Sequence, residues 1–278
     1  MKTVFVLIAF FLTTQLLGLY LGSQLIQAVS IGEISPPLGN PENIENSFIL
    51  FGEIVIFTAV ILILIRFRKS VIRILEAFVI FMASWLTFDI LIPVWIWYLS
   101  VGFFLALILT TWKMYRPTIL NQNVAAIISG AGVGALLGIT LGTLPAVVFM
   151  IILSIYDFVS VFITKHMVHM AKALSERPTA FTVAAPHNFK HLTYVGIKKA
   201  KKKVHIFQLG VGDMVIPLMF TVSILNSFSL INAIASMIGS TLALFTLIYL
   251  MSKKPQPMPA LPFITFGTFA TFLISLII

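Results

Sequence analysis

Long uninterrupted apolar runs dominate the sequence, and they constrain the fold more than any other feature. A helix needs about 20 apolar residues to cross the hydrocarbon core of a bilayer. Nine runs approach that length, and they cover residues 4–27, 47–65, 71–91, 94–112, 123–144, 146–164, 206–226, 230–251 and 259–278. We therefore predict an all-α, polytopic membrane protein with nine transmembrane helices.

The composition supports the same class of protein. Hydrophobic residues make up 59% of the 278 residues and charged residues only 10%, whereas a soluble domain is about half apolar and a quarter charged. This excess disfavours a soluble enzyme, a disordered chain and a nucleic-acid-binding domain. The absence of cysteine from the sequence excludes disulfides, thiolate zinc sites and cysteine nucleophiles.

The basic residues predict the orientation of the bundle. If the N-terminus lies inside, all 18 Lys and Arg residues fall in the inner segments and none in the outer loops. The positive-inside rule then predicts the N-terminus inside and the C-terminus outside. The basic run at 198–203 is interpreted as an anchor that contacts anionic membrane lipid, and no nucleic-acid partner is expected.

Two aspartates are predicted to lie deep in the membrane. Glu53, Glu76 and Asp89 lie near span ends, where water can reach them, but Asp157 and Asp213 lie further in. Counted as helix at 1.5 Å per residue, both lie roughly 12 Å from the same inner boundary. Because their spans are consecutive and antiparallel, we expect the two side chains to face one another.

Two carboxyl groups in such an environment cannot both ionise easily, so we expect the pair to share one proton. One aspartate can then activate water as a general base while the other protonates a carbonyl oxygen or a leaving amine. The alternative is a proton or cation relay in a leak channel or an ion-coupled transporter. The pair alone does not decide between them.

The residues around the pair shift this balance towards a peptide substrate. Gly210 and Gly212 leave the chain without side chains just before Asp213. Pro217 has no N–H, so it cannot donate a hydrogen bond to the carbonyl of Asp213. Helix packing with a kink is the alternative explanation. The proline-rich segment 255–262 predicts an extended chain before the last span, or simply a helix start.

Three motifs in this order resemble the presenilin and signal peptide peptidase family. Tyr156-Asp157, Gly210-x-Gly212-Asp213 and Pro259-Ala260-Leu261 lie on the sixth, seventh and ninth spans and resemble that family's YD, GxGD and PAL motifs. The predicted orientation matches presenilin rather than signal peptide peptidase, which is inverted, and the compact loops resemble those of the archaeal presenilin homologues. Residues 214–217 are closer to signal peptide peptidase, whereas residues 259–262 are closer to presenilin.

The resemblance implies an intramembrane aspartic endopeptidase of the GxGD type. Asp157 and Asp213 would be the catalytic dyad, without metal or cofactor. The substrates would be transmembrane proteins or peptides whose helices must unwind. The substrate-binding residues would be Tyr156, Gly210, Gly212, Pro259, Ala260 and Leu261.

The resemblance also implies one integral membrane protease domain over residues 1–278. Helices 1–6 would reach about residue 175, an inner loop would cover 176–205, and helices 7–9 would cover 206–278. The protein would be a multi-pass membrane protein in contact with lipid, and it would lie in the cell membrane if the source is a prokaryote. Assembly into a homo-oligomer is left open.

Two further patterns have structural explanations. Glycines recur every fourth residue through the fifth span, which predicts a bare helix face for tight packing; they are Gly130, Gly134, Gly138 and Gly142, with Gly132 between. Five histidines lie near the inner boundary, and we interpret them as loop or interface residues rather than metal ligands. They are His166, His169, His187, His191 and His205.

Overall fold

The structure, a computed structural model, describes residues 2–67, 69–96, 99–163, 182–186, 206–253 and 258–277. These residues contain nine α-helices and a short π-helix, η1 (Val159–Ile163). The α-helices are α1 (Lys2–Ser30), α2 (Glu45–Phe67), α3 (Lys69–Leu91), α4 (Val101–Tyr115), α5 (Ile119–Thr140), α6 (Thr143–Phe158), α8 (Gly212–Ser227), α9 (Leu230–Lys253) and α10 (Ala260–Ser275). The nine-helix prediction is thus confirmed.

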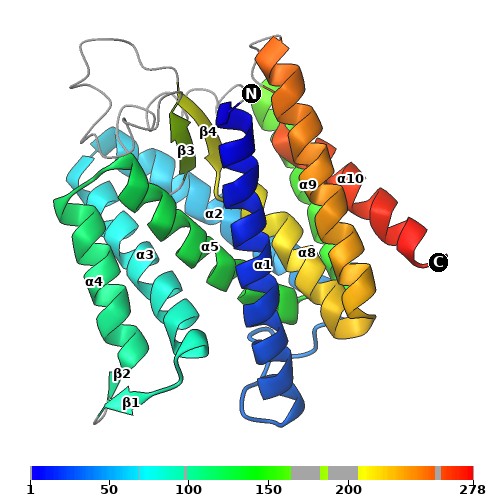
Figure 1. The fold of residues 1–278 in the computed structure, drawn as a ribbon, viewed down its shortest axis with the longest axis horizontal. Coiled ribbons are helices and arrows are strands. Elements are labelled where there is room, and N and C mark those ends of the chain that lie inside the picture. Colours follow the sequence, from blue (N-terminus) through cyan, green and yellow to red (C-terminus); the bar gives the residue numbers. More distant parts are fainter. Residues whose placement is uncertain are drawn as a thin grey trace.

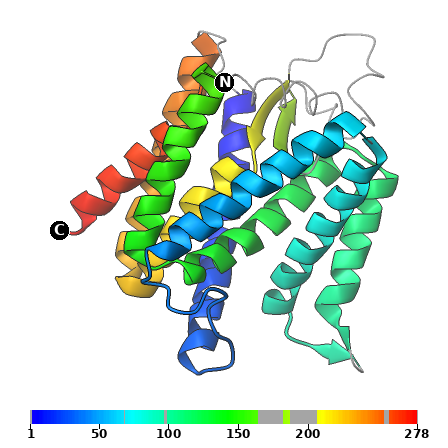
Figure 2. The same ribbon diagram turned by 180° about the vertical axis from the view of Figure 1, so that it is seen from behind.

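The helices run between two ends of the molecule. The N-terminus and the strands β3 (Thr182–Pro186) and β4 (Ile206–Gly210) lie at the top of Figure 1, and the loop after α1 and the hairpin of β1 (Trp95–Ile96) and β2 (Leu99–Ser100) lie at the bottom. Figure 2 shows the same arrangement from behind. Five helices of the described residues are long and apolar enough to cross a membrane, and α4, α8 and α10 are shorter apolar helices. Which end faces the cell interior stays a prediction.

Two predicted spans are wrong at their beginning. Residues 95–96 and 99–100 pair as the antiparallel strands β1 and β2, and α4 begins only after Ser100, whose hydroxyl accepts a hydrogen bond from the Phe103 N–H at 3.1 Å. Residues 206–210 form β4, which pairs with β3 in antiparallel register, so α8 begins only at Gly212. Both segments are apolar enough for a helix, but strand pairing satisfies their backbone groups instead.

The helix α8 packs between α1 and α5, and glycines face it from both sides. A Cβ atom on Gly18 of α1 would stand 2.1 Å from Leu218, and one on Gly134 of α5 would stand 2.5 Å from the same side chain. Leu218 is fully buried between these two backbones. Small residues that allow close backbone approach are the typical basis of helix packing in membranes.

One turn further along α8, Val222 is held in the same way. A Cβ on Gly22 would lie 2.6 Å from Val222, and one on Gly138 would lie 2.5 Å from Val222 and 2.8 Å from the Met219 carbonyl oxygen. The predicted bare face of α5 is therefore confirmed from Gly130 to Gly138, and it packs on α8. The matching glycines of α1 were not predicted.

Of the other glycines in the α5 series, Gly130 also faces α8, whereas Gly132 and Gly142 do not. Gly130 belongs to the same face, because a Cβ there would lie 3.2 Å from Val211 and 3.6 Å from Val215 of α8, while Gly132 points to another side of the helix, towards Thr87 of α3. Gly142 lies just beyond α5, at the start of α6, where it faces the Glu42 side chain. The predicted glycine face thus ends at Gly138.

The sequence suggested that water reaches Glu76, but the structure gives this side chain a protein partner instead. Its carboxylate accepts a hydrogen bond from the Lys113 ammonium in a buried ion pair between α3 and α4. A buried charge is stable only with such a partner. The pair therefore joins the two helices whose other ends form the β1–β2 hairpin.

The close approach of α5 and α8 can be tested with Gly138→Ala. The added methyl would meet the backbone carbonyl of Met219, which cannot move aside, so we expect the free energy of unfolding to fall by about 1–3 kcal/mol. Thermal unfolding in detergent measures this. Gly52→Ala on α2 is the control, because nothing lies within 4 Å of a Cβ there; equal midpoints for the two variants would contradict the packing described.

Candidate active site

Asp157 lies in the last turn of α6 and is 7% exposed. The α-helix widens directly after it into η1, where the Ser160 hydroxyl donates a hydrogen bond to the Asp157 carbonyl at 3.0 Å. Single π-helical turns inside α-helices often occur at functional sites. The irregular turn here holds the backbone that carries the acid.

The first turn of α10 points its amide groups at the Asp157 carboxyl. The N–H of Leu261 donates to Asp157 Oδ2 at 3.2 Å, and the amide of Ala260 also bonds this carboxyl. The chain reaches this position because Pro259, the residue before the helix, has an extended backbone. The first amides of a helix have no partner within the helix and suit a carboxylate.

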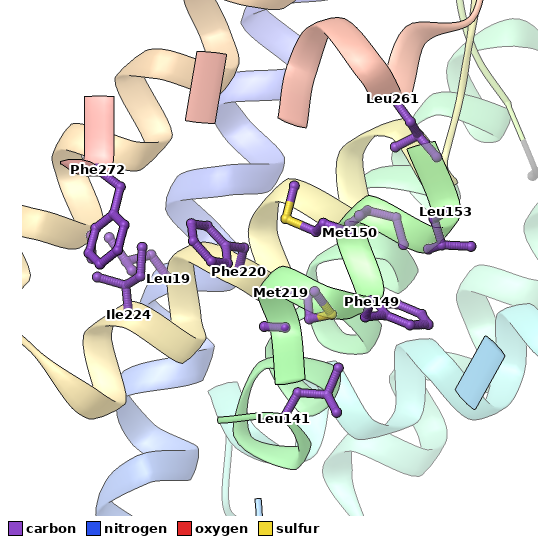
Figure 3. Packing of buried hydrophobic residues seen from close by; sticks show 13 residues of the cluster. Leu19, Leu141, Phe149, Met150, Leu153, Met219, Phe220, Ile224, Leu261 and Phe272 are labelled. Carbon is purple, nitrogen blue, oxygen red and sulfur yellow. The ribbon is translucent and has the colours of Figure 1, made fainter. Parts of the chain in front are cut away.

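The Leu261 side chain fixes these amides in place. It belongs to a buried cluster that joins residues of α1, α6, α8 and α10, shown in Figure 3 with Leu153 and Met150 of α6. One turn from Leu261 and Asp157, the hydroxyls of Thr265 and Ser154 form a hydrogen bond of 2.8 Å between α10 and α6. An apolar and a polar contact thus set the position of α10 along α6.

Asp213 lies in the first turn of α8, not inside a longer helix as predicted. The equal-depth argument counted 206–210 as helix, and the strand β4 replaces that part. A backbone hydrogen bond from Gly210 reaches the Asp213 carboxyl. A Cβ on Gly210 would stand 3.2 Å from Asp213 Oδ2, while the space around the exposed Gly212 is open.

The structure brings the two acids together. The helices α6 and α8 pack against one another, and the carboxyl groups of Asp157 and Asp213 interact electrostatically. The two helices that carry the acids are thus neighbours, and the direct facing of the two side chains stays a prediction. Each carboxyl also accepts from backbone amides of a neighbouring segment, α10 for Asp157 and the end of β4 for Asp213.

The Tyr156 side chain packs against α2. Its ring packs edge-on against Phe51 of α2, with the ring centroids 5.9 Å apart, and its hydroxyl is hydrogen-bonded to the Thr58 side chain. The structure therefore places Tyr156 between α6 and α2, beside the site. Adjacent residues of a helix point about 100° apart, which explains why Tyr156 and Asp157 face different helices.

Two amide side chains that the sequence analysis did not single out hold β3. Asn123 of α5 donates to the Ala184 carbonyl and accepts from the Ala184 N–H, both at 2.8 Å. Gln122 donates to the Thr182 hydroxyl at 2.9 Å. Three consecutive amide residues, 121–123, at the start of an apolar span were the signal that could have found this contact.

The predictions about the histidines and about the inner loop at 176–205 concern other parts of the chain. All five histidines lie outside the described residues, as does the 176–205 loop apart from β3. Within the described residues, no group of three or more His, Asp or Glu side chains could hold a metal ion.

Comparison with known proteins gives the class of the protein. Two solved structures of a presenilin family intramembrane aspartate protease have the same fold. One, in space group P2, is 22% identical with a TM-score of 0.69, and the match covers 97% of this chain and 96% of the other. The second, in space group C222, is 23% identical with a TM-score of 0.66, and the match covers 97% of both chains. The fold is therefore that of a presenilin-type integral membrane protein.

The sequence defines the family. The family described as "signal-peptide peptidase, presenilin aspartyl protease" matches residues 8–278. The chain belongs to this family, and the protein is an integral membrane protein and an intramembrane aspartyl protease. No curated protein matches the sequence.

The Ser154–Thr265 hydrogen bond can be tested with a double-mutant cycle. We expect Ser154→Ala and Thr265→Val to be non-additive, with a coupling free energy of about 0.6 kcal/mol, because they remove the same bond. Unfolding in detergent gives the three values. Ser154→Ala with Thr246→Val on the exposed face of α9 is the control pair and should be additive; an additive first cycle would show that the bond is not formed.

Proposed function

We propose that the protein is an endopeptidase of the GxGD type in which Asp157 and Asp213 form the catalytic dyad. The observation that carries the proposal is that the packed helices α6 and α8 hold two carboxyls near enough for their charges to interact, with Asp157 bonded by the Leu261 amide. In the reaction, one aspartate takes a proton from water, and the oxygen of that water attacks the carbonyl carbon of the peptide bond. The other aspartate donates its proton to the carbonyl oxygen.

The tetrahedral intermediate then breaks at the carbon–nitrogen bond. The amine leaves with a proton from the aspartate that had acted as base, and the second aspartate recovers its own proton as the carboxylic acid forms. No metal and no covalent enzyme intermediate is needed for this balance. Because the two acids titrate as one unit, the roles of base and acid belong to the pair.

The substrates are transmembrane helices, and they must unwind before cleavage. A peptide bond within a helix is shielded by its own hydrogen bonds, so an extended segment has to be held beside the dyad. The open space around Gly212 supports close approach of such a backbone to Asp213. Gly210, Pro259, Ala260 and Leu261 shape the site by holding the two carboxyls.

The strand β4 is a suitable surface for the unwound segment. Asn123 and Gln122 bind the backbone of β3 at Ala184 and Thr182, so the side of β3 that faces away from β4 is occupied. Since Ala184 is opposite Gln208, the backbone groups of Gln208 face away from β3 in turn. An extended peptide can pair there, on the strand that leads directly to Asp213.

The dyad is tested with Asp157→Asn and Asp213→Asn. Each change removes an acid–base group and preserves shape, so cleavage of a single-span peptide in liposomes should fall at least about 100-fold. Asp89→Asn, on α3 beside Gly102, is the matched control for an acid in a helix and should keep its activity. Cleavage by either dyad variant at the normal rate would contradict the proposal, and aspartate-dependent ion flux without peptide products would favour a channel.

The position of the Asp213 carboxyl is tested with Gly210→Ala. The new methyl would lie only 3.2 Å from Asp213 Oδ2 and would displace this carboxyl slightly. Because small displacements of reacting groups are costly, we expect kcat to fall about 10-fold. Thermal stability should be unchanged, since alanine is not worse than glycine in a strand. An unchanged kcat would show that Gly210 does not set the carboxyl position.

A further inference from the structure

Gln15 of α1 is a fully buried polar side chain that contacts the segment carrying Asp213. Its Nε2 donates a hydrogen bond of 2.8 Å to the carbonyl oxygen of Met214, the residue directly after Asp213. The two partners are 199 residues apart in the sequence. This bond joins the first transmembrane helix to the first turn of α8.

The first turn of α8 has few bonds of its own. Its amides at Met214 and Val215 donate to the Val211 carbonyl, at 3.0 and 2.9 Å, and no side chain caps the helix. The carbonyl of Asp213 has no donor four residues on, because that residue is Pro217. Gln15 adds a donor from another helix to the next carbonyl, that of Met214, beside the position where α8 lacks one of its own hydrogen bonds.

Close packing fixes the position of this donor. Gln15 precedes Gly18 and Gly22 on one face of α1, and these glycines contact Leu218 and Val222 on the face of α8 that begins at Met214. The contacting residues therefore advance together along the two helices, by three and then four residues on α1 and by four residues each time on α8. The amide thus stands at a defined height beside Asp213.

The fold itself gains little from this amide. Its Oε1 is buried and has no hydrogen-bond partner in the part of the chain that the structure describes. One net hydrogen bond stabilises a protein only modestly, and an unsatisfied buried acceptor costs at least as much. An apolar side chain of the same length would pack here without that cost.

We propose that Gln15 is a positioning residue for the reaction: through the Met214 carbonyl it holds the first turn of α8, and so the Asp213 carboxyl, opposite Asp157. The inference rests on the proposed function of the dyad. It predicts that removing the amide lowers the rate of the chemical step without lowering stability. A residue that served only the fold would show the opposite.

The test compares Gln15→Met with the wild type and with Thr14→Val. Methionine keeps the length and fills the space but cannot donate, whereas the neighbouring Thr14 is equally buried and bonds only the Phe10 carbonyl of its own helix. Cleavage of a single-span peptide in liposomes gives kcat and KM, and thermal unfolding in detergent gives stability. Gln15→Asn keeps the amide but shortens the side chain by one carbon, so it too should lose the bond.

We expect kcat to fall at least about 10-fold in Gln15→Met and Gln15→Asn, with KM within about twofold of wild type. The unfolding midpoint of Gln15→Met should equal or exceed that of the wild type, and Thr14→Val should keep its kcat. An unchanged kcat in Gln15→Met, or a loss of kcat that follows a loss of folded protein, would overturn the proposal. Wild-type cleavage that depends on both aspartates tests the proposed function separately.

Discussion

The close packing of α8 between α1 and α5 is the constraint on which the rest of the structure depends. Leu218 and Val222 lie between glycines of two different helices, so α8 can neither slide nor rotate without a clash. In a bilayer, apolar side chains gain little from leaving lipid, and such contacts replace the hydrophobic driving force of soluble proteins. The first turn of α8, with Asp213, inherits this fixed position.

The site is built where regular structure stops. Asp157 lies where α6 becomes a π-helix, Asp213 where a strand becomes a helix, and the amides of Ala260 and Leu261 where an extended segment becomes α10. Backbone amides at such junctions have no partner within their own element, so they are available to the carboxyls. This arrangement stabilises acids inside a membrane protein through backbone amides.

Much of this could be predicted from the sequence because membrane helices carry a strong local signal. The nine helices and the bare face of α5 follow from apolar length and residue spacing. The β1–β2 hairpin and β4 could not be predicted, because an apolar segment such as 206–210 suits a strand as well as a helix. Gly18, Gly22 and Gln15 were missed because their meaning depends on the partner helix.

The sequence by itself thus determined the class of protein, the helix count and the two acids, since these follow from the cost of placing polar groups in lipid. Only the tertiary structure decided how the acids are held. Contacts such as Leu261 with Asp157, or Gln15 with Met214, join residues more than 100 positions apart. Their geometry depends on how the helices pack, and local residue patterns do not contain that information.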